Sequence, residues 1–501
     1  MPIAKIHSRA LLGISAPLVT VEAHVSAGLP AFTLVGLPET AVRESRDRVR
    51  AAILSSGFEF PPRRLTVNLA PADLPKESAR FDLAIAVAIL AATDQLPATA
   101  RDRLGHIECL GELSLDGSVR PIRGALSAAR AARDAGRELI LPEEGRHEAQ
   151  LIPGVRGHTV DHLAELVGFL AGERELETLR HHAPEGIDPA ADGDLADVRG
   201  QPRAKRALAI AAAGGHNLLL VGPPGAGKSM LARRLAGILP PMTEEEALAA
   251  AEVAAVTPAG FDPAHFGRRP FRAPHHSASA VALIGGGSQP GPGEISLAHH
   301  GTLFLDELPE FDRRVLEALR EPMESREVMI SRAARQATFP AAFQLIAAMN
   351  PSPQGTEIHS RAAQRYRAKI SGPLLDRIDI HLEVPRVPAT DLDRAEQDGE
   401  DSSMVRSRVV AARERMLSRQ GRINARLDAR GVADQAPLGP AERTMLNQAI
   451  EKLGLSGRAR ERILKLARTI ADYDQRPEID ATALGEAIGY RNLDRWFSSS
   501  G

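Results

Sequence analysis

The apolar positions of the first 170 residues change period several times, as in a mixed α+β domain. Alternating apolar and polar residues predict strands, whereas apolar residues spaced three and four apart predict helices. Strands are expected over residues 16–25, 32–36 and 65–69, helices over 39–56 and 82–92, and a hairpin over 109–117. The hairpin would turn at Asp116-Gly117, a pair that favours tight turns. The pattern predicts an α+β domain over residues 1–172.

After residue 195 the pattern changes, because short continuous apolar runs alternate with segments of helical periodicity. Such runs are typical of buried strands. Strands are expected over residues 216–221, 302–305 and 345–349, helices over 203–213, 230–239 and 404–420, and a small helical bundle over 440–490. We therefore expect an α/β core over 195–390 and a small α-helical C-terminal domain over 391–501. The charged segment 173–194, with its prolines and glycines, and the acidic segment 391–403 are predicted linkers.

Length and composition limit the classes of protein that fit. A chain of 501 residues suggests about three domains. The 62 Lys and Arg residues against 64 Asp and Glu give a net charge of −2, so nucleic-acid binding would need local basic patches. Cys109 is the one cysteine, which excludes a disulfide framework and fits a reducing cytoplasm. The longest apolar run, residues 83–92, is too short to cross a bilayer, so we expect a cytoplasmic protein without a membrane partner.

Residues 222–229 fit the pattern G-x-x-x-x-G-K-[ST] of a phosphate-binding loop between a predicted strand and a predicted helix. Glycines let backbone N–H groups approach phosphate oxygens, and the start of the helix adds a favourable dipole. Lys228 is expected to reach the β- and γ-phosphates of ATP, and Ser229 to bind Mg²⁺. The alternative is a glycine-rich turn before an ordinary helix. The predicted nucleotide-binding residues here are Gly222, Pro223, Pro224, Gly225, Ala226, Gly227, Lys228, Ser229 and Met230.

Two carboxylates, Asp306 and Glu307, follow the apolar run over 302–305. We expect Asp306 to hold Mg²⁺ through water. Glu307 is expected to orient and deprotonate the attacking water. The alternative is a pair of exposed acids that cap the next helix.

Polar residues elsewhere are candidates for the same site. Asn350 follows the apolar run over 345–349 and is expected to polarise the attacking water, the role called sensor 1. Arg377 is expected to reach the nucleotide of a neighbouring subunit and to stabilise the charge of the transition state. Its alternative is a surface ion pair with Asp376 or Asp379.

Two further segments complete the predicted site. Val198, Gly200 and Gln201 lie in a stretch similar to the one that borders the adenine pocket of AAA+ ATPases. Arg458, in the first turn of a helix of the C-terminal bundle, suits a contact with the phosphates, the role called sensor 2. Arg460 is the second candidate for that role, and a solvated basic face is the alternative.

Parts of the first domain, residues 71–83 and 111–124, resemble the catalytic fold of Lon proteases, a ribosomal S5 domain 2-like fold. Active Lon-type enzymes carry a serine and a lysine that form a catalytic dyad. Arg80 and Ala128 stand at the matching positions here, and Ser78 would be a shifted nucleophile. The resemblance therefore implies an adaptor or binding domain without protease activity.

The chain as a whole resembles the magnesium-chelatase-like AAA+ ATPases, and within them the YifB/ComM competence-protein family. This clade carries an insert between the phosphate-binding loop and Asp306, and a hairpin before sensor 1. Many members have Cys-Pro-Cys-Gly after the sensor-1 Asn-Pro, whereas this chain has residues Ser352 to Gly355, so a role tied to those cysteines is not implied. The most specific segments are residues 272–277, 285–299, 327–340 and 371–377.

The resemblance implies ATP and Mg²⁺ as cofactors, a hexameric ring with ATP at the subunit interfaces, and a C-terminal lid domain. It also implies a DNA helicase that drives branch migration during natural transformation or homologous recombination. Its partners would be single-stranded or branched DNA and recombination proteins. Arg332 and Arg335 at the hairpin tip would meet DNA phosphates without reading sequence; the alternative is a structural β-ribbon with solvated arginines. The alternative function is a magnesium-chelatase-type AAA+ motor that remodels a protein partner.

Two histidine pairs, His275-His276 and His299-His300, lie in or beside the expected insert. Zinc sites usually need further ligands at close spacing, and no carboxylate or cysteine completes either pair. We therefore interpret these histidines as insert or packing residues.

Overall fold

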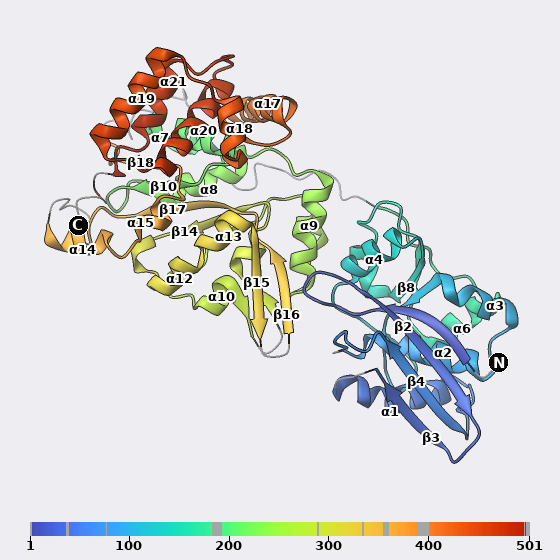
Figure 1. The fold of residues 1–501 in the computed structure, drawn as a ribbon. Coiled ribbons are helices and arrows are strands. Elements are labelled where there is room, and N and C mark those ends of the chain that lie inside the picture. Colours follow the sequence, from blue (N-terminus) through green and yellow to red (C-terminus); the bar gives the residue numbers. More distant parts are fainter. Residues whose placement is uncertain are drawn as a thin grey trace. The chain divides into compact units, whose positions relative to one another are not determined.

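The computed structural model describes residues 3–36, 40–76, 78–182, 193–287, 290–332, 335–353, 360–388, 400–494 and 496. The chain divides into two compact units (Figure 1), and each is described by itself. The first comprises Met1–Glu185 and Ala251–Phe266, and the second comprises Gly186–Ala250 and Gly267–Gly501. Within the described ranges, no helix combines the length and the apolar character needed to span a membrane.

The first unit is built on a seven-stranded mixed sheet with the strand order β3-β4-β2-β1-β5-β8-β9. β1, β2 and β4 are antiparallel neighbours, whereas β5, β8 and β9 run parallel to one another. The strands are β1 (Ile3–Arg9), β2 (Leu18–Ser26), β3 (Ala31–Val35), β4 (Arg64–Ala70), β5 (Ile107–Cys109), β8 (Glu138–Pro142) and β9 (Gly157–Val160).

Helix α2 (Asp82–Ala92) lies in the core of this unit. All eleven of its residues are buried, and it contacts strands β1 and β2. A helix that is apolar on every side must be enclosed by protein, so its apolar sequence sets its place. The other helices include α1 (Thr40–Ser55), α3 (Ala98–Arg103), α4 (Ala125–Asp134), α5 (Arg146–Ala149) and α6 (Leu163–Ala171).

The expected strands and helices of this unit are confirmed to within two residues at their ends. The hairpin prediction was partly wrong, because Cys109 ends β5 in the large sheet. The hairpin itself is shorter, with β6 (Glu112–Leu113) paired to β7 (Val119–Arg120). The sequence pattern did not predict β1, α4, β8, β9 or α6.

The stability of the first unit is expected to fall as the pH rises from about 4 to 6. Asp82 is buried beside Ser45 and Arg48, and burial raises the pKa of its carboxyl to about 6 against the opposing effect of both partners. A folded-state pKa above the unfolded value favours folding at low pH, and that contribution is lost as the pH passes the folded pKa. The difference between the folded and unfolded pKa of Asp82 corresponds to about 3 kcal/mol at most.

This prediction can be measured in the full chain through Cys109, which is buried in the same unit. Burial raises the pKa of this thiol, so the folded protein should react slowly. Urea-dependent labelling of Cys109 with dithiodipyridine at pH 4 and pH 7 would report the opening of the unit. Asp82→Asn should remove most of the pH difference; an unchanged difference in that variant would contradict the assignment.

The first part of the predicted linker over 173–194 packs on the first unit. The Leu179 N–H donates to Gly157 O at 2.9 Å, His182 N–H donates to Gln150 O at 2.9 Å, and Leu179 is buried. Residues 183–192 lie outside the described residues, as does 391–399 of the second predicted linker.

The second unit contains a five-stranded parallel sheet with the order β11-β14-β17-β10-β18. Its three central strands are buried throughout, which explains their continuous apolar sequences. The strands are β10 (Leu218–Val221), β11 (Phe271–Arg272), β14 (Thr302–Leu305), β17 (Gln344–Met349) and β18 (Ile380–Glu383).

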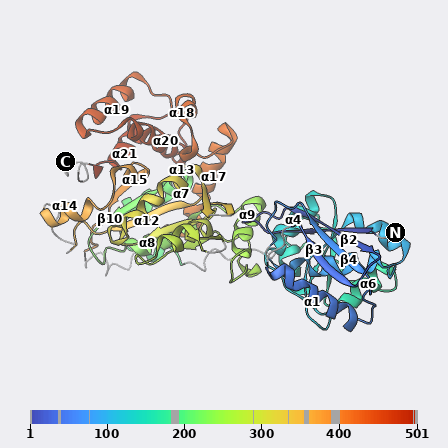
Figure 2. The same ribbon diagram turned by 60° about the horizontal axis from the view of Figure 1, so that its bottom comes forward.

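Helices α7 (Pro202–Gly214) and α8 (Lys228–Ile238) cover this sheet, and the C-terminal helices pack against them (Figure 2). α17 contacts both α7 and α8, and α20 contacts α7. The predicted C-terminal bundle is therefore confirmed as a helical region. It consists of α17 (Ser402–Gln420), α18 (Ala429–Gln435), α19 (Pro440–Leu453), α20 (Gly457–Tyr473) and α21 (Ala481–Gly489).

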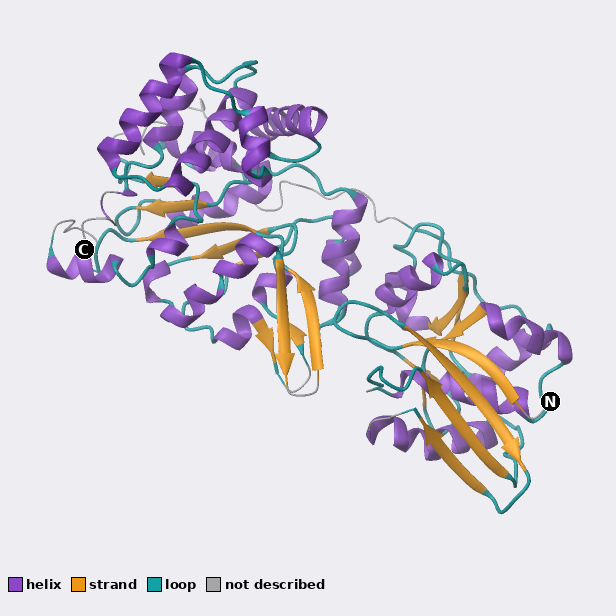
Figure 3. Cartoon of the chain, viewed as in Figure 1, coloured by secondary structure: helices purple, strands orange, loops and turns teal. Residues whose placement is uncertain are grey.

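The predicted hairpin is also confirmed. β15 (Glu327–Arg332) and β16 (Arg335–Pro340) form a separate two-stranded sheet that stands apart from the parallel sheet (Figure 3). Val328, Ile330 and Phe339 are buried, whereas the Met329 side chain between two of them is largely exposed. One face of the hairpin thus packs on the unit.

The expected insert is a set of short elements: α10 (Ala280–Ile284), β12 (Gly285–Gly286), β13 (Gly291–Pro292) and α11 (Glu294–Leu297). The remaining helices of this part of the chain are α12 (Arg313–Ala318), α13 (Arg320–Ser325), α14 (Arg361–Arg367) and α15 (Gly372–Leu375).

Candidate functional site

The glycine-rich loop lies where β10 ends and α8 begins, as the sequence predicted. A Cβ on Gly222 would lie 2.1 Å from the carbonyl oxygen of Val384, the residue after β18. Only glycine fits this approach of two backbones. Gly227, which precedes α8, has φ +88°, a conformation that other residues rarely adopt. The loop therefore exposes backbone N–H groups at the start of a helix, as anion binding requires.

Lys228 is buried at the centre of the site. Its Nζ donates to Gly222 O at 2.8 Å, to Pro223 O at 3.0 Å and to Asn350 Oδ1 at 3.1 Å. Burial lowers the pKa of this amine, while Asp306 and Glu307 act in the opposite direction. The ammonium is thus held by neutral oxygens that a phosphate can replace.

Two hard oxygen ligands meet beside the lysine. Ser229 Oγ donates to Asp306 Oδ2 at 2.6 Å. Mg²⁺ is usually bound by one or two protein oxygens together with phosphate and water, so these two residues suit it. In the part of the chain that the structure describes, no three His, Cys, Asp or Glu side chains gather as a metal site. Further ligands would therefore come from phosphate and water.

Glu307 follows Asp306 in a left-handed conformation, with φ +52°. It occupies the position before a short 3₁₀ helix, yet its side chain makes no cap hydrogen bond. The alternative interpretation of these acids as helix caps is therefore wrong for Glu307. Its carboxylate is open to solvent, where a catalytic base can meet water.

The Glu307 carboxylate has a partner that the sequence pattern did not predict. His276 Nδ1 lies 3.2 Å from Glu307 Oε2, and the His276 ring stacks on that of His275. His276 is thus more than a packing residue. His299, in contrast, accepts from the Ala342 N–H at 3.0 Å, as a packing residue does. Nothing in the sequence spacing links residue 276 to 307, because the two meet only through the pairing of β11 with β14.

Replacing His276 by alanine is expected to lower the rate of ATP hydrolysis about fivefold. The imidazole fixes one carboxylate oxygen of Glu307. Loss of that contact should raise the activation free energy of hydrolysis by about 1 kcal/mol, because the carboxylate is then less well oriented. Steady-state hydrolysis of His276→Ala and His276→Gln would measure this, with glutamine expected to keep most of the rate. His275→Ala is the matched control. An equal or higher rate in His276→Ala would contradict an orienting role.

Asn350 lies directly after β17, so its side chain reaches the same sheet edge as the ends of β10 and β14. The carboxyl ends of parallel strands meet at one edge, which is where ligands of such sheets bind. The structure thus brings together Lys228, Ser229, Asp306 and Asn350, all of which the sequence singled out.

The segment predicted beside the adenine also lies near this edge. Gln201 Nε2 donates to Pro385 O at 2.6 Å, and a Cβ on Gly200 would meet Val387 at 3.5 Å. Both partners follow β18, the strand beside β10. Val198 is buried, and Met230, at the start of α8, is 45% exposed.

Arg377 and Arg458 lie at the opposite edge of the sheet. Arg377 lies three residues before β18. The four residues of β18 span about 13 Å and pair in parallel with β10, the strand that leads to the phosphate-binding loop. Arg458 lies one turn before Arg462 on α20, and Arg462 pairs with Asp379 at 2.6 Å, also before β18. The structure therefore does not bring either arginine to the phosphate-binding loop of its own chain.

The predicted alternative for Arg377, an ion pair with Asp376 or Asp379, is wrong. Arg377 is buried and pairs with Glu324 at 2.7 Å, and it also donates to Pro373 O. Asp379 is occupied by Arg462 and by His216, at 2.6 and 3.3 Å. These partners outweigh the effect of burial and lower the pKa of Asp379.

Arg332 and Arg335 are register partners at the ends of β15 and β16. The backbone therefore puts both residues next to the turn of the hairpin, as the sequence predicted. Their side chains lie outside the described part of the structure.

Comparison with protein-family models gives three matches. Magnesium chelatase, subunit ChlI, matches residues 194–392; Subunit ChlI of Mg-chelatase matches residues 21–145; and Magnesium chelatase, subunit ChlI C-terminal, matches residues 399–491. These matches cover both compact units.

Individual proteins are similar over nearly the full length. The uncharacterized protein YifB of Salmonella typhimurium is 50% identical over 501 residues, which cover 99% of this chain and 98% of that protein. Competence protein ComM of Haemophilus influenzae is 48% identical over 504 residues, with the same coverage. The uncharacterized protein Rv2897c of Mycobacterium tuberculosis is 41% identical over 508 residues, 98% of this chain and 99% of that protein.

Proposed function

The chain belongs to the magnesium chelatase subunit ChlI family and is a relative of YifB and ComM, and from this premise we propose that it is an ATP-driven DNA motor. The observation that carries the proposal is the cluster of Lys228, Ser229, Asp306 and Asn350 at one sheet edge. The motor would act in the cytoplasm on single-stranded or branched DNA. Its work would be helicase or branch-migration activity in natural transformation or homologous recombination, with recombination proteins as partners.

The residues of the cluster divide the work of ATP hydrolysis. Lys228 exchanges its carbonyl partners for phosphate oxygens, and Ser229 and Asp306 hold Mg²⁺. Mg²⁺ supplies charge neutralisation at the phosphates. Glu307 takes a proton from the attacking water, and Asn350 orients that water. Val198, Gly200 and Gln201 border the base.

Arg377 and Arg458 support a ring. Both lie on the edge away from the loop of their own chain, so they can act only on the nucleotide of another copy. A closed ring gives every loop such a neighbour. We propose a hexamer, in which Arg377 stabilises the charge of the transition state and Arg458 contacts the phosphates.

The hairpin is the proposed contact with DNA. Its strands are regular, and the register ends with Arg332 opposite Arg335. Two arginines beside a turn can meet phosphates without reading sequence. The relative in Haemophilus influenzae is named a competence protein, and this name supports the proposal of work on DNA.

The first unit is proposed to serve as an adaptor with a Lon-like fold and without protease activity. Arg80, which stands at the serine position, is buried, and its guanidinium donates to the backbone of Arg9 and Arg123. Burial lowers its pKa to about 10. Ala128, at the lysine position, is buried and carries no base.

ATP hydrolysis is expected to rise in the presence of a four-way DNA junction, and to lose that response in an Arg332→Ala, Arg335→Ala variant. Loss of two phosphate contacts should weaken DNA binding about tenfold and reduce the salt dependence by about two charges. Hydrolysis with and without junction DNA would be measured at two salt concentrations. Arg430→Ala, which removes an exposed side chain of α18, is the control. Junction DNA that neither binds nor stimulates the wild type would refute the proposal.

A second candidate is a magnesium-chelatase-type motor that remodels a protein partner. It is favoured by the family models, all three of which describe magnesium chelatase. The same hydrolysis assay would separate the two, because stimulation by a porphyrin with its insertion protein, and none by DNA, would support the second.

A further inference from the structure

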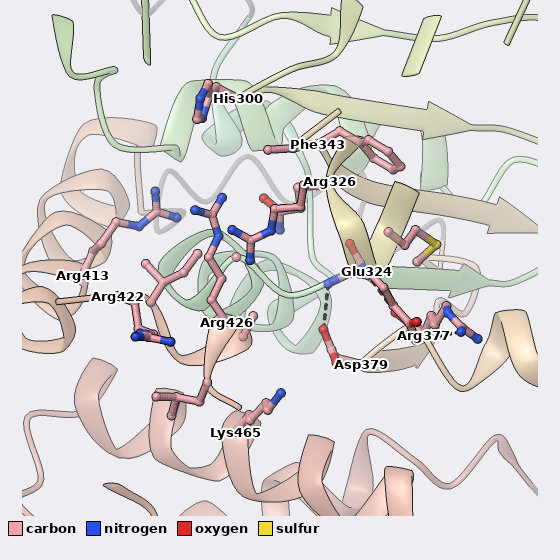
Figure 4. Close-up of a pocket in the computed structure, with 18 of the residues that line it drawn as sticks. His300, Glu324, Arg326, Phe343, Arg377, Asp379, Arg413, Arg422, Arg426 and Lys465 are labelled. Atoms are coloured by element: carbon pink, nitrogen blue, oxygen red, sulfur yellow. Dashed lines mark hydrogen bonds and ion pairs between the residues drawn. The ribbon is translucent and has the colours of Figure 1, made fainter. Parts of the chain in front are cut away.

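A cavity of about 550 Å³ opens at the amino ends of the parallel strands, on the sheet edge away from the phosphate-binding loop (Figure 4). Asn217, Gln344 and Asp379, which precede or begin β10, β17 and β18, line it, together with α17, the segment 421–428 and α20. The volume falls within the range of sites for small organic ligands.

The lining of this cavity is strongly cationic. Eight arginine and lysine residues face four aspartates and glutamates. The acids are largely occupied, because each lies within ion-pair distance of one arginine. The pairs are Arg269 with Glu246, Arg377 with Glu324, Arg462 with Asp379, and Arg422 with Asp428.

The other four cations, Arg326, Arg413, Arg426 and Lys465, have no ion-pair partner within the described ranges. Arg413 donates only to the backbone carbonyls of Ala212 and Ala213. Figure 4 shows the guanidinium groups of Arg326, Arg413 and Arg426 pointing into one space, with Lys465 directed toward it from α20.

Arg326, Arg413 and Lys465 are half-buried and Arg426 is exposed to the cavity, and cations held close together in such partly shielded surroundings carry a cost. Burial lowers the pKa of Arg413 to about 9, and burial together with the charge of Arg426 lowers the pKa of Arg326 to about 10. Burial also lowers the pKa of Arg426 and Lys465, although Arg426 keeps contact with solvent in the cavity. Unpaired charges in such surroundings destabilise a fold unless a counter-ion joins them.

We propose that this cavity is a second anion site, which binds a polyphosphate group through Arg326, Arg413 and Arg426. Guanidinium groups bind phosphate oxygens in pairs, and several unpaired cations suit a multiply charged ligand. The polyphosphate has two sources, a free anion in solution or the triphosphate of ATP held by a second copy of the chain. The second source rests on the proposed ring, whereas the first does not.

The site is joined to the hairpin. Arg326 lies between α13 and β15 with φ +63°, and its carbonyl accepts from the Ala341 N–H, the residue after β16. Ala342 and Phe343 also line the cavity. A bound anion would therefore fix the root of the hairpin, far from its tip.

The first test uses the full chain with Lys228→Ala, so that the phosphate-binding loop does not contribute. Inorganic tripolyphosphate is titrated by calorimetry, and one saturable site is expected. Arg326→Gln with Arg426→Gln should weaken binding by about tenfold or more, while Arg326→Lys, which keeps the charge without the planar fork, should bind more tightly than Arg326→Gln and less tightly than the parent. Arg430→Gln, whose side chain is 92% exposed, should bind as the parent does.

Thermal unfolding separates a ligand site from a structural role. Without the probe, the double variant should unfold at the same or a higher temperature than its parent, by up to about 3 °C. Tripolyphosphate should raise the unfolding temperature of the parent and not that of the double variant. A lower unfolding temperature without the probe would mean that these arginines support the fold, and would overturn the proposal.

The second test distinguishes the sources. Chains with Lys228→Ala and an intact cavity are mixed with chains that carry the double cavity substitution and an intact loop. Recovery of ATP hydrolysis in the mixture would support the neighbouring nucleotide, and binding in the first test without recovery would support a free anion. Failure of both tests would overturn the proposal. If junction DNA does not stimulate ATP hydrolysis in chains whose cavity is intact, that result would count against the proposed function and not against the anion site.

Discussion

Replacing Arg377 by alanine is expected to lower the rate of ATP hydrolysis by about 10³-fold or more. The arginine lies before β18, at the edge away from its own loop, and one guanidinium nitrogen, Nε, is buried without a hydrogen-bond partner within the described ranges. Its partner Glu324 is 59% exposed, so the pair can open toward another chain. Hydrolysis of Arg377→Ala, with nucleotide binding measured separately, would test this.

The controls for Arg377 separate charge, shape and assembly. Arg377→Lys keeps the charge without the planar fork and should recover little activity. Glu324→Gln removes the ion pair but keeps the arginine, and should retain most of the rate. Mixing Arg377→Ala chains with Lys228→Ala chains should restore hydrolysis, since one provides the loop and the other the arginine. No recovery, although mixed rings form, would show that Arg377 does not act on a neighbour.

Replacing Glu307 by glutamine is expected to lower hydrolysis by about 10²- to 10⁴-fold while ATP binding stays intact. Glutamine keeps the size and the hydrogen bonding of the side chain but cannot take a proton. The Glu307 side chain is 52% exposed, so the change should leave stability within about 0.5 kcal/mol. Binding of a fluorescent ATP analogue and single-turnover hydrolysis would measure the two effects.

Glu310→Gln is the matched control for Glu307. Glu310 ends the same short helix and only pairs with Lys369 at 3.4 Å across an exposed surface. Its substitution should leave hydrolysis nearly unchanged. Loss of nucleotide binding in Glu307→Gln, or equal rates in both variants, would argue against a proton-accepting role.

Local patterns predicted the parts of the fold and site that depend on neighbouring residues. The strand, loop and helix around Lys228 are adjacent in sequence, and Asp306 and Asn350 each follow an apolar run. Because these runs form parallel strands, their ends had to meet at one edge. The cluster could therefore be predicted from the sequence, because it follows from the parallel arrangement of these strands.

The rest depended on contacts between distant segments. His276 contacts Glu307 from the segment after the edge strand β11, and Glu324 of α13 pairs with Arg377. The cationic cavity is assembled from Arg326, Arg413 and Arg426, each of which looks like an ordinary charged residue of a helix or loop in the sequence. No period or motif marks them, because only the packing of α17 and α20 on α7 brings these distant segments together.

The division of the chain between its two units has a practical consequence for protein engineering. Helix α9 (Glu244–Ala255) begins in the second unit, and its last turns belong to the first, together with residues up to Phe266. Val253 and Ala255 are buried there. A shortened chain that starts at the second unit would still contain residues 251–266. Their apolar side chains would be exposed without the rest of the first unit, so this chain should tend to aggregate. Replacing residues 251–266 by a short polar linker should give a soluble ATPase fragment.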